Sequence, residues 1–154
     1  MSKLRVADDD HGDAAGKHLA DAQALVDAAR FDGAGYLSGY VVECALKAVI
    51  LHERSFNPTT GLHDATVLAT EHAALSRRPF GHDLTRLLGV TITPTGASYV
   101  PFIPSNAALI RDWKETLRYR PPGTVSETRA RSYFEWACTV YEQSVLRMKL
   151  DGVI

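Results

Sequence analysis

The segment from Phe31 to Arg54 is apolar around almost its whole circumference when it is drawn as a helix. At about 100° per residue, apolar side chains and glycines cover two opposite flanks. One narrow polar stripe separates these flanks; its members are Tyr36, Tyr40, Glu43, Lys47 and Arg54. Because a helix that is apolar nearly all round is normally a buried one, the pattern predicts a central helix covered from two sides.

Charges and glycines within this segment add two expectations. Glu43 and Lys47 interrupt the apolar pattern, so the segment falls short of the roughly 20 apolar residues that span a bilayer, and we expect no membrane contact. Gly35 and Gly39 lie one turn apart, although each costs roughly 1 kcal/mol relative to Ala inside a helix. We therefore expect another backbone to approach closely there, with a bound ligand as the alternative.

A second apolar pattern with helical spacing precedes the central helix. Asp13 is expected to cap a helix that runs to about Arg30. Its apolar positions are Leu19, Ala22, Val26 and Ala29. The short FDGAG turn that follows predicts that these two helices are antiparallel neighbours. Residues 1–12 have little apolar content and three consecutive aspartates, so we expect a disordered tail there.

The middle of the chain is broken into shorter elements. A loop is expected at residues 56–61, and Asp64 is expected to cap a short helix after it. A break at residues 79–81 separates that helix from a brief one whose apolar positions are Leu84, Leu87 and Leu88.

Residues 89–104 form the longest stretch without helical periodicity, and they contain three prolines. Loops of this length are usually functional or mobile, so we expect a loop. A short β-ribbon that pairs residues 90–93 with residues 98–102 is the alternative.

Two more helices are predicted in the C-terminal third. Ser105 is expected to cap a helix through Leu117, which Pro121-Pro122-Gly123 must end. Ser126 is expected to cap a long amphipathic helix. The apolar positions of that helix are Ala130, Phe134, Ala137, Tyr141, Val145 and Met148. The fold class is therefore all-α: one domain, residues 13–150, built as an antiparallel up-and-down bundle of four to five main helices.

Composition narrows the class of protein. The 154 residues are 45% hydrophobic and 23% charged, as in an ordinary soluble globular domain. The net charge of −1 gives no general attraction to nucleic acid or acidic membranes, so any such binding needs a local patch. Without a secretory pattern at the N-terminus, Cys44 and Cys138 are expected as reduced thiols in a cytoplasmic protein.

The polar stripe is the first candidate for chemistry. Glu43 and Lys47 stand at i and i+4, in the favourable order for an ion pair. The stripe is either a solvated helix edge or the wall of a groove, in which tyrosine and glutamate orient a basic group or a nucleotide.

The second candidate is a basic cluster around Pro121-Pro122-Gly123, interleaved with Tyr119 and Tyr133. Its basic members are Arg111, Lys114, Arg118, Arg120, Arg129 and Arg131. Guanidinium forks could hold phosphate while a tyrosine stacks on a base. A salt-bridged surface turn or a dimer contact explains the same residues.

The third candidate is the pair His82-Asp83. An aspartate beside a histidine can support acid–base chemistry. Alternatively, Asp83 is simply a helix N-terminal residue that the helix dipole favours. The six histidines show no paired His or Cys–His spacing, so we expect no metal site and no cofactor.

The sequence YLSGYVVECALKA at residues 36–48 resembles the second-helix signature of HEPN domains (higher eukaryotes and prokaryotes nucleotide-binding). Three further pieces agree in order, so that the resemblance covers residues 14 to 148. They are His18–Ala22 ahead of Arg30–Ala34, then His82-Asp83-Leu84, and then Trp113 followed by Leu117-Arg118-Tyr119. The resemblance implies a helical bundle that commonly forms a homodimer. Many members pair with a minimal nucleotidyltransferase, in toxin–antitoxin or defence-type systems.

The ribonuclease branch of that family uses an arginine followed, after four to six residues, by a histidine. Arg118 stands where this arginine is expected, but no histidine follows it at that spacing. Arg77 with His82, and Arg5 with His11, have the spacing without the helical context. The resemblance therefore implies a catalytically degenerate member.

These observations together predict a homodimeric HEPN-type binding module for a nucleotide, RNA or a partner nucleotidyltransferase. The expected ligand-binding residues are Tyr40, Glu43, Lys47, Arg118, Tyr119 and Arg120. The alternative is a metal-independent endoribonuclease, with His82 as acid–base group and Arg77 or Arg118 stabilising the phosphorane. A third hypothesis is an interaction protein that covers its partner with the apolar loop Tyr99 to Ile103.

Overall fold

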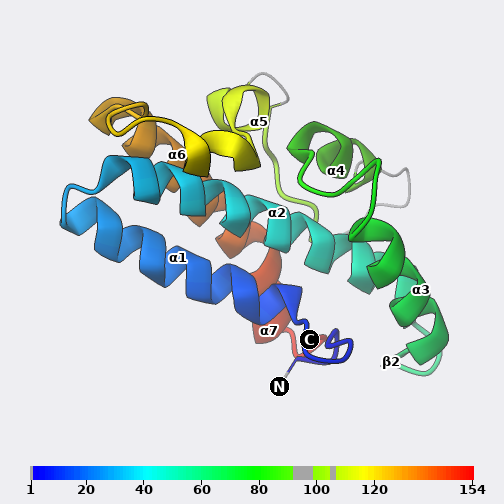
Figure 1. Ribbon diagram of the computed structural model, residues 1–154. Coiled ribbons are helices and arrows are strands. Elements are labelled where there is room, and N and C mark those ends of the chain that lie inside the picture. Colours follow the sequence, from blue (N-terminus) through cyan, green and yellow to red (C-terminus); the bar gives the residue numbers. More distant parts are fainter. Residues whose placement is uncertain (1, 92–98, 105–106) are drawn as a thin grey trace.

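Three long helices form the body of the protein, and the computed structural model describes residues 2–91, 99–104 and 107–154 (Figure 1). Helices α1 (His11–Asp27) and α2 (Phe31–Ser55) form an antiparallel hairpin, and α6 (Glu127–Tyr141) packs against both. Shorter elements surround this bundle: β1 (Phe56–Asn57), β2 (Leu62–His63), α3 (Ala65–Leu75), α4 (Leu84–Thr91), α5 (Ala108–Asp112) and a 3₁₀ helix, η1 (Glu115–Tyr119). The all-α class predicted from the sequence is confirmed.

Helix α2 is the centre of the core, as its apolar pattern predicts. Every residue from Val41 to His52 is buried, because α1 and α6 cover opposite sides of the helix and α3 and α4 pack near its C-terminal end. Its length and composition would suffice to cross a membrane, but 83% of its most apolar window is buried inside the protein. This is how the core helix of a soluble protein behaves.

Gly35 and Gly39 on α2 accommodate side chains rather than a backbone. A Cβ atom on Gly39 would lie 1.9 Å from Cε2 of Trp113, and one on Gly35 would lie 2.8 Å from Cγ1 of Val125. Trp113 is 1% exposed, and its Nε1 donates a hydrogen bond to the carbonyl oxygen of Tyr36 at 3.1 Å. The expectation of an approaching backbone or ligand was therefore wrong.

The same tryptophan divides the helix predicted up to Leu117. Trp113 and Lys114 adopt extended backbone conformations (ψ 135° and 145°), so α5 ends at Asp112 and η1 begins at Glu115. Burial of the indole against Gly39 overrides the helical propensity of these residues. The predicted cap, Ser105, lies outside the described residues, as do residues 92, 93 and 98 of the alternative β-ribbon. The described part of that ribbon contains no strand: Val90 and Thr91 belong to α4, and residues 99–102 are a turn and irregular chain.

The N-terminal segment differs from the expected tail. Helix α1 begins at His11, and its cap is Asp10, whose carboxylate accepts a hydrogen bond from the backbone N–H of Asp13 at 3.1 Å. Asp13 therefore does not cap the helix; it pairs with Lys149 at 2.7 Å. Leu4 is fully buried in the core, so the segment before α1 lies against the bundle.

The capping predictions for α3 and α6 are confirmed. The carboxylate of Asp64 accepts from Thr66 and Val67 at the start of α3, and the hydroxyl of Ser126 accepts from Arg129 at the start of α6. Helix α6 continues through a π-helical turn, η2 (Glu142–Leu146), into α7 (Arg147–Leu150). The wider turn shifts the buried face. Its buried residues are Ala130, Tyr133, Ala137, Val140, Ser144, Val145 and Met148, whereas Phe134 and Tyr141 are only partly buried.

The Trp113 contact generates a stability prediction. We expect Gly39→Ala to lower the free energy of unfolding by about 3 kcal/mol, because its Cβ overlaps a buried indole that cannot move away. The control is Gly89→Ala in α4, where a Cβ would meet no atom of the described residues within 4 Å and Ala should stabilise the helix by up to about 1 kcal/mol. Urea denaturation measures both; equal stability of Gly39→Ala and wild type would contradict the packing.

Candidate functional site

Two members of the polar stripe of α2, Glu43 and Lys47, turn into the protein, whereas Tyr36 and Tyr40 are partly buried and Arg54 is exposed. Glu43 is 3% exposed and Lys47 is 4% exposed, and Nζ of Lys47 donates to Oε1 of Glu43 at 2.8 Å. The solvated-edge interpretation is therefore wrong for these two residues. Desolvation of a carboxylate and an ammonium is costly unless further hydrogen bonds compensate, so the remaining partners of Glu43 matter.

His82 is the second partner of Glu43. The loop before α4 places Nδ1 of His82 at 2.8 Å from Oε2 of Glu43, so the two carboxylate oxygens serve different partners. Because the carboxylate accepts, Nδ1 is the nitrogen that carries the proton. The imidazole is 46% exposed and therefore presents Nε2 at the surface. Asp83 is a structural cap, as the second interpretation predicted, since its carboxylate accepts from the N–H of Arg86 at 3.1 Å.

Tyr40 lies at the centre of an aromatic group beside His82. Its ring centroid is 5.6 Å from that of His82 and 5.3 Å from that of Trp113, with edge-to-face geometry in both contacts. Tyr36 completes the row and donates its hydroxyl to the hydroxyl of Tyr40 at 3.3 Å. Burial, followed by the hydrogen bond with Tyr36 and the negative charge of Glu43, raises the pKa of Tyr40. Tyr40 is therefore a neutral hydroxyl.

Arg118 reaches this row from η1. A hydrogen bond with Tyr36 is the main cause that raises the pKa of Arg118 above its usual value, with Tyr119 contributing. Its guanidinium carbon lies 4.7 Å from the ring centroid of Tyr119, which is 73% exposed. The structure thus brings the predicted residues Tyr40, Glu43, Lys47 and Arg118 into one polar strip along α2. Sequence reasoning assigned Tyr36 to the stripe but not to the site.

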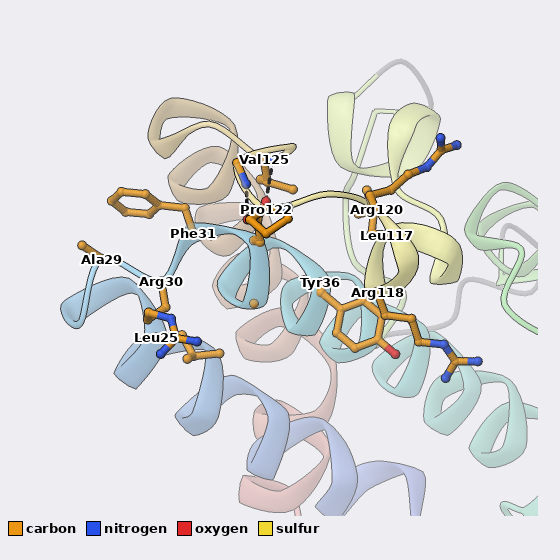
Figure 2. Close-up of a pocket in the computed structure, with 13 residues that line it drawn as sticks. Leu25, Ala29, Arg30, Phe31, Tyr36, Leu117, Arg118, Arg120, Pro122 and Val125 are labelled. Atoms are coloured by element: carbon orange, nitrogen blue, oxygen red, sulfur yellow. Dashed lines mark hydrogen bonds between the residues drawn. The ribbon is translucent and has the colours of Figure 1, made fainter.

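Other members of the basic cluster do not join this strip. Arg120 leaves η1 in a different direction from Arg118, so the two guanidiniums do not form a clamp (Figure 2). Arg111 pairs with Asp112 at 2.6 Å, and Arg131 pairs with Glu127 at 2.8 Å. The salt-bridged surface turn, the second interpretation of this cluster, describes Arg111 and Arg131.

Tyr133 and Arg77 also lie apart from the strip. Tyr133 is 1% exposed and packs inside the bundle, so it cannot stack on a ligand. Within the described part of the chain, no hydrogen bond or ion pair joins Arg77 to His82. Arg77 is also not among the described residues that line the cavity beside His82.

Two further basic residues lie beside His82: Arg78, which sequence reasoning did not assign to any site, and Lys114, which it assigned to the basic cluster and not to His82. Arg78, His82 and Lys114 line a cavity of about 430 Å³, together with Asp83 and Glu115. Arg78 and Lys114 come from segments that are distant in the sequence, and only the packing of η1 beside the loop before α4 brings them together. No spacing pattern in the sequence could have indicated this.

A pair of stacked histidines, His11 and His72, lies beyond Lys47. The rings of His11 and His72 stack with centroids 5.1 Å apart. Burial, followed by the positive charge of Lys47 and by His72, lowers the pKa of His11 to about 4. In the ranges that the structure describes, no group of three or more His, Cys, Asp or Glu residues is arranged to hold a metal ion.

Comparison of the chain with models of protein families, with curated proteins and with solved structures gave no match. A fold alone does not define a function, so the functional inference depends on the chemistry of the strip. That chemistry combines a fixed imidazole, a row of tyrosines and a cluster of basic side chains.

The buried pair generates a prediction for a double-mutant cycle. We expect Lys47→Met to lower the free energy of unfolding by about 3 kcal/mol, because it leaves the buried Glu43 carboxylate without its cation. The double variant Glu43→Leu/Lys47→Met should recover most of this loss, since it removes both charges. Denaturant unfolding of the single and double variants measures the coupling, and strict additivity would contradict a paired arrangement.

The lowered pKa of His11 predicts a pH dependence of stability. An unfolded histidine has a pKa near 6.5, whereas His11 in the folded protein has a pKa of about 4. Between these values the unfolded chain binds more protons, so the contribution is complete above pH 6.5 and is lost as the pH falls toward 4. His11→Gln should flatten the pH profile of unfolding by an amount on the order of 2 kcal/mol. Identical profiles for variant and wild type would contradict the burial of His11.

Proposed function

We propose that the protein is a HEPN-like binding module for a nucleotide or single-stranded RNA, and that the polar strip along α2 is the binding site. The observation that supports this most directly is the hydrogen bond by which the buried Glu43 fixes His82 at the surface, beside Tyr40. A carboxylate that is 3% exposed holds the imidazole in one orientation, so the recognition group is arranged before the ligand arrives.

The strip supplies both kinds of contact that a single strand requires. Tyr36 and Tyr40 are partly exposed rings on which a base can stack, and Arg118 at the end of the row can hold a phosphate through its guanidinium. With a net charge of −1 the whole chain does not attract nucleic acid, so attraction must come from this local cluster.

The cavity beside His82 adds positive charge next to the strip. Arg78 and Lys114 line it and add two positive charges beyond the imidazole. A bound strand would thus meet cations at both ends of the row of rings: Arg118 at one end, and Arg78 with Lys114 at the other. Glu43 and Lys47 act from beneath by holding His82, and they do not contact the ligand in this proposal.

The resemblance of residues 36–48 to the second helix of HEPN domains extends the proposal to localisation, oligomeric state and partner. On that basis the protein is a cytoplasmic homodimer that associates with a minimal nucleotidyltransferase in a toxin–antitoxin or defence-type system. The all-α bundle with a central polar-striped helix agrees with that class.

A metal-independent ribonuclease is the second candidate, and the same Glu43–His82 hydrogen bond favours it. With Nδ1 held by the carboxylate, Nε2 of His82 can act as a base toward a hydroxyl group. Arg118 could then stabilise the negative charge that develops on the oxygens of the phosphorane. A histidine that only binds RNA and one that cleaves it have the same resting geometry, so an experiment must separate them.

Fluorescence anisotropy of a short labelled oligoribonucleotide of mixed sequence tests the binding site. We expect His82→Ala and Arg118→Ala each to weaken binding by about tenfold, because each removes a charged or polar contact to the strand. Arg129→Ala is the matched control, since Arg129 is an exposed arginine outside the strip. Equal affinities for all three variants would contradict the proposed site.

The same samples, incubated and resolved by electrophoresis, separate the two candidates. Intact RNA at high protein concentration supports the binding module. Fragments that form with wild type and disappear with His82→Ala would establish the ribonuclease instead.

A further inference from the structure

A second cavity, separate from the His82 cavity, opens at the far end of η1. It has a volume of about 530 Å³, which falls within the range of small-molecule sites in proteins. Three segments form it: the C-terminal end of α1, the first turns of α2, and the chain from η1 to Val125 (Figure 2). We call it the Arg30 pocket.

Much of the lining of the Arg30 pocket is apolar. Its apolar members come from all three segments and are Leu25, Ala29, Phe31, Leu117, Pro122 and Val125. Figure 2 shows Leu25, Arg30 and Phe31 at one end of the pocket and Tyr36 with Leu117 at the other. This surface can cover the body of a ring-sized ligand, because apolar walls of this kind bury most of a small ligand's surface.

The polar groups of the pocket are predominantly basic. Arg30, Arg118 and Arg120 line it, against a single carboxylate, Asp32. Asp32 is already occupied, since its two oxygens accept from the backbone N–H groups of Gly123 at 2.6 Å and Val125 at 2.7 Å. These backbone donors also lower the pKa of Asp32, so backbone N–H groups, and not an arginine, stabilise its negative charge.

The three arginines differ in what they can offer a ligand. Arg118 is engaged with Tyr36 and Tyr119, and Arg120 points away from the pocket in Figure 2. Arg30 extends beside Leu25 at the apolar end, and within the described residues no hydrogen bond or ion pair engages its guanidinium. The basic group next to the apolar wall is thus the one whose donors remain unused.

We infer that the Arg30 pocket binds a small organic anion, with its apolar ring against Leu25, Phe31 and Val125 and its anionic group on the guanidinium of Arg30. This inference does not rest on the proposed function. It concerns a different cavity, and among the described residues only Arg118 and Tyr36 border both sites.

The probe for this inference is 2-naphthyl phosphate, compared with 2-naphthol, which lacks the charge, and with inorganic phosphate, which lacks the ring. Calorimetric titration of the full-length protein gives the affinities, and amide chemical shifts give the location. We expect 2-naphthyl phosphate to bind at least about tenfold more tightly than either comparison compound. The largest shifts should fall on Gly33, Gly123 and Val125, whose amides lie at the pocket.

Substitutions of single arginines test which side chain contacts the anionic group of the probe. Arg30→Gln should weaken 2-naphthyl phosphate binding by about tenfold, because a charge-assisted hydrogen bond is lost. Arg120→Gln should change it little, and Arg129→Gln is the control on a surface outside the pocket. The amide spectrum of each variant reports whether the fold is intact.

Several outcomes would overturn the inference. They are an absence of measurable binding, equal affinity of Arg30→Gln and wild type, equal affinity for inorganic phosphate, and shifts confined to the neighbourhood of His82. The last outcome would place the probe in the polar strip. Loss of RNA binding with retained probe binding, or the reverse, would separate this inference from the proposed function.

Discussion

The buried carboxylate of Glu43 is the interaction on which the candidate site depends. It lies on the central helix, nearly without solvent, and its two oxygens bind Lys47 and His82 at 2.8 Å each. An ionised group in such a position is tolerated only when its hydrogen bonds are satisfied. The requirement acts in both directions, because Glu43 needs the loop before α4 to supply His82, and the loop is held in place by Glu43.

The contact between Trp113 and Gly39 fixes the position of η1 and its basic residues beside α2. The indole occupies space that any side chain larger than glycine would fill, and it interrupts the helix between α5 and η1. Its hydrogen bond to the carbonyl of Tyr36 ties η1 to the first half of α2. Arg118 consequently lies against Tyr36, and Lys114 lies in the cavity with His82. One packing interaction therefore sets which basic residues surround the row of tyrosines.

The placement of η1 between two cavities concentrates basic side chains on this surface. One cavity is lined by His82 with Arg78 and Lys114, and the other by Arg30 and Arg118 beside an apolar wall. Both gather positive charge on a chain whose net charge is −1. Local concentration of arginine and lysine around apolar or aromatic surfaces is typical of sites for organic anions and nucleic acids, where charge attracts the ligand and rings orient it.

The sequence by itself determined the long helices α1, α2 and α6, because helical periodicity is a local property; it did not determine the division of α5 from η1. The apolar pattern of α2, the caps Asp64 and Ser126, and the stop at Pro121 could all be predicted from neighbouring residues. The pairing of Lys47 with Glu43 was also a local inference, since the two lie one turn apart. The tertiary structure alone decided that this pair is buried, that His82 completes it, and that Arg78 and Lys114 border His82 while Arg120 turns away. These relations join residues that are distant along the chain, and they depend on how an indole and two glycines pack, which no spacing in the sequence encodes.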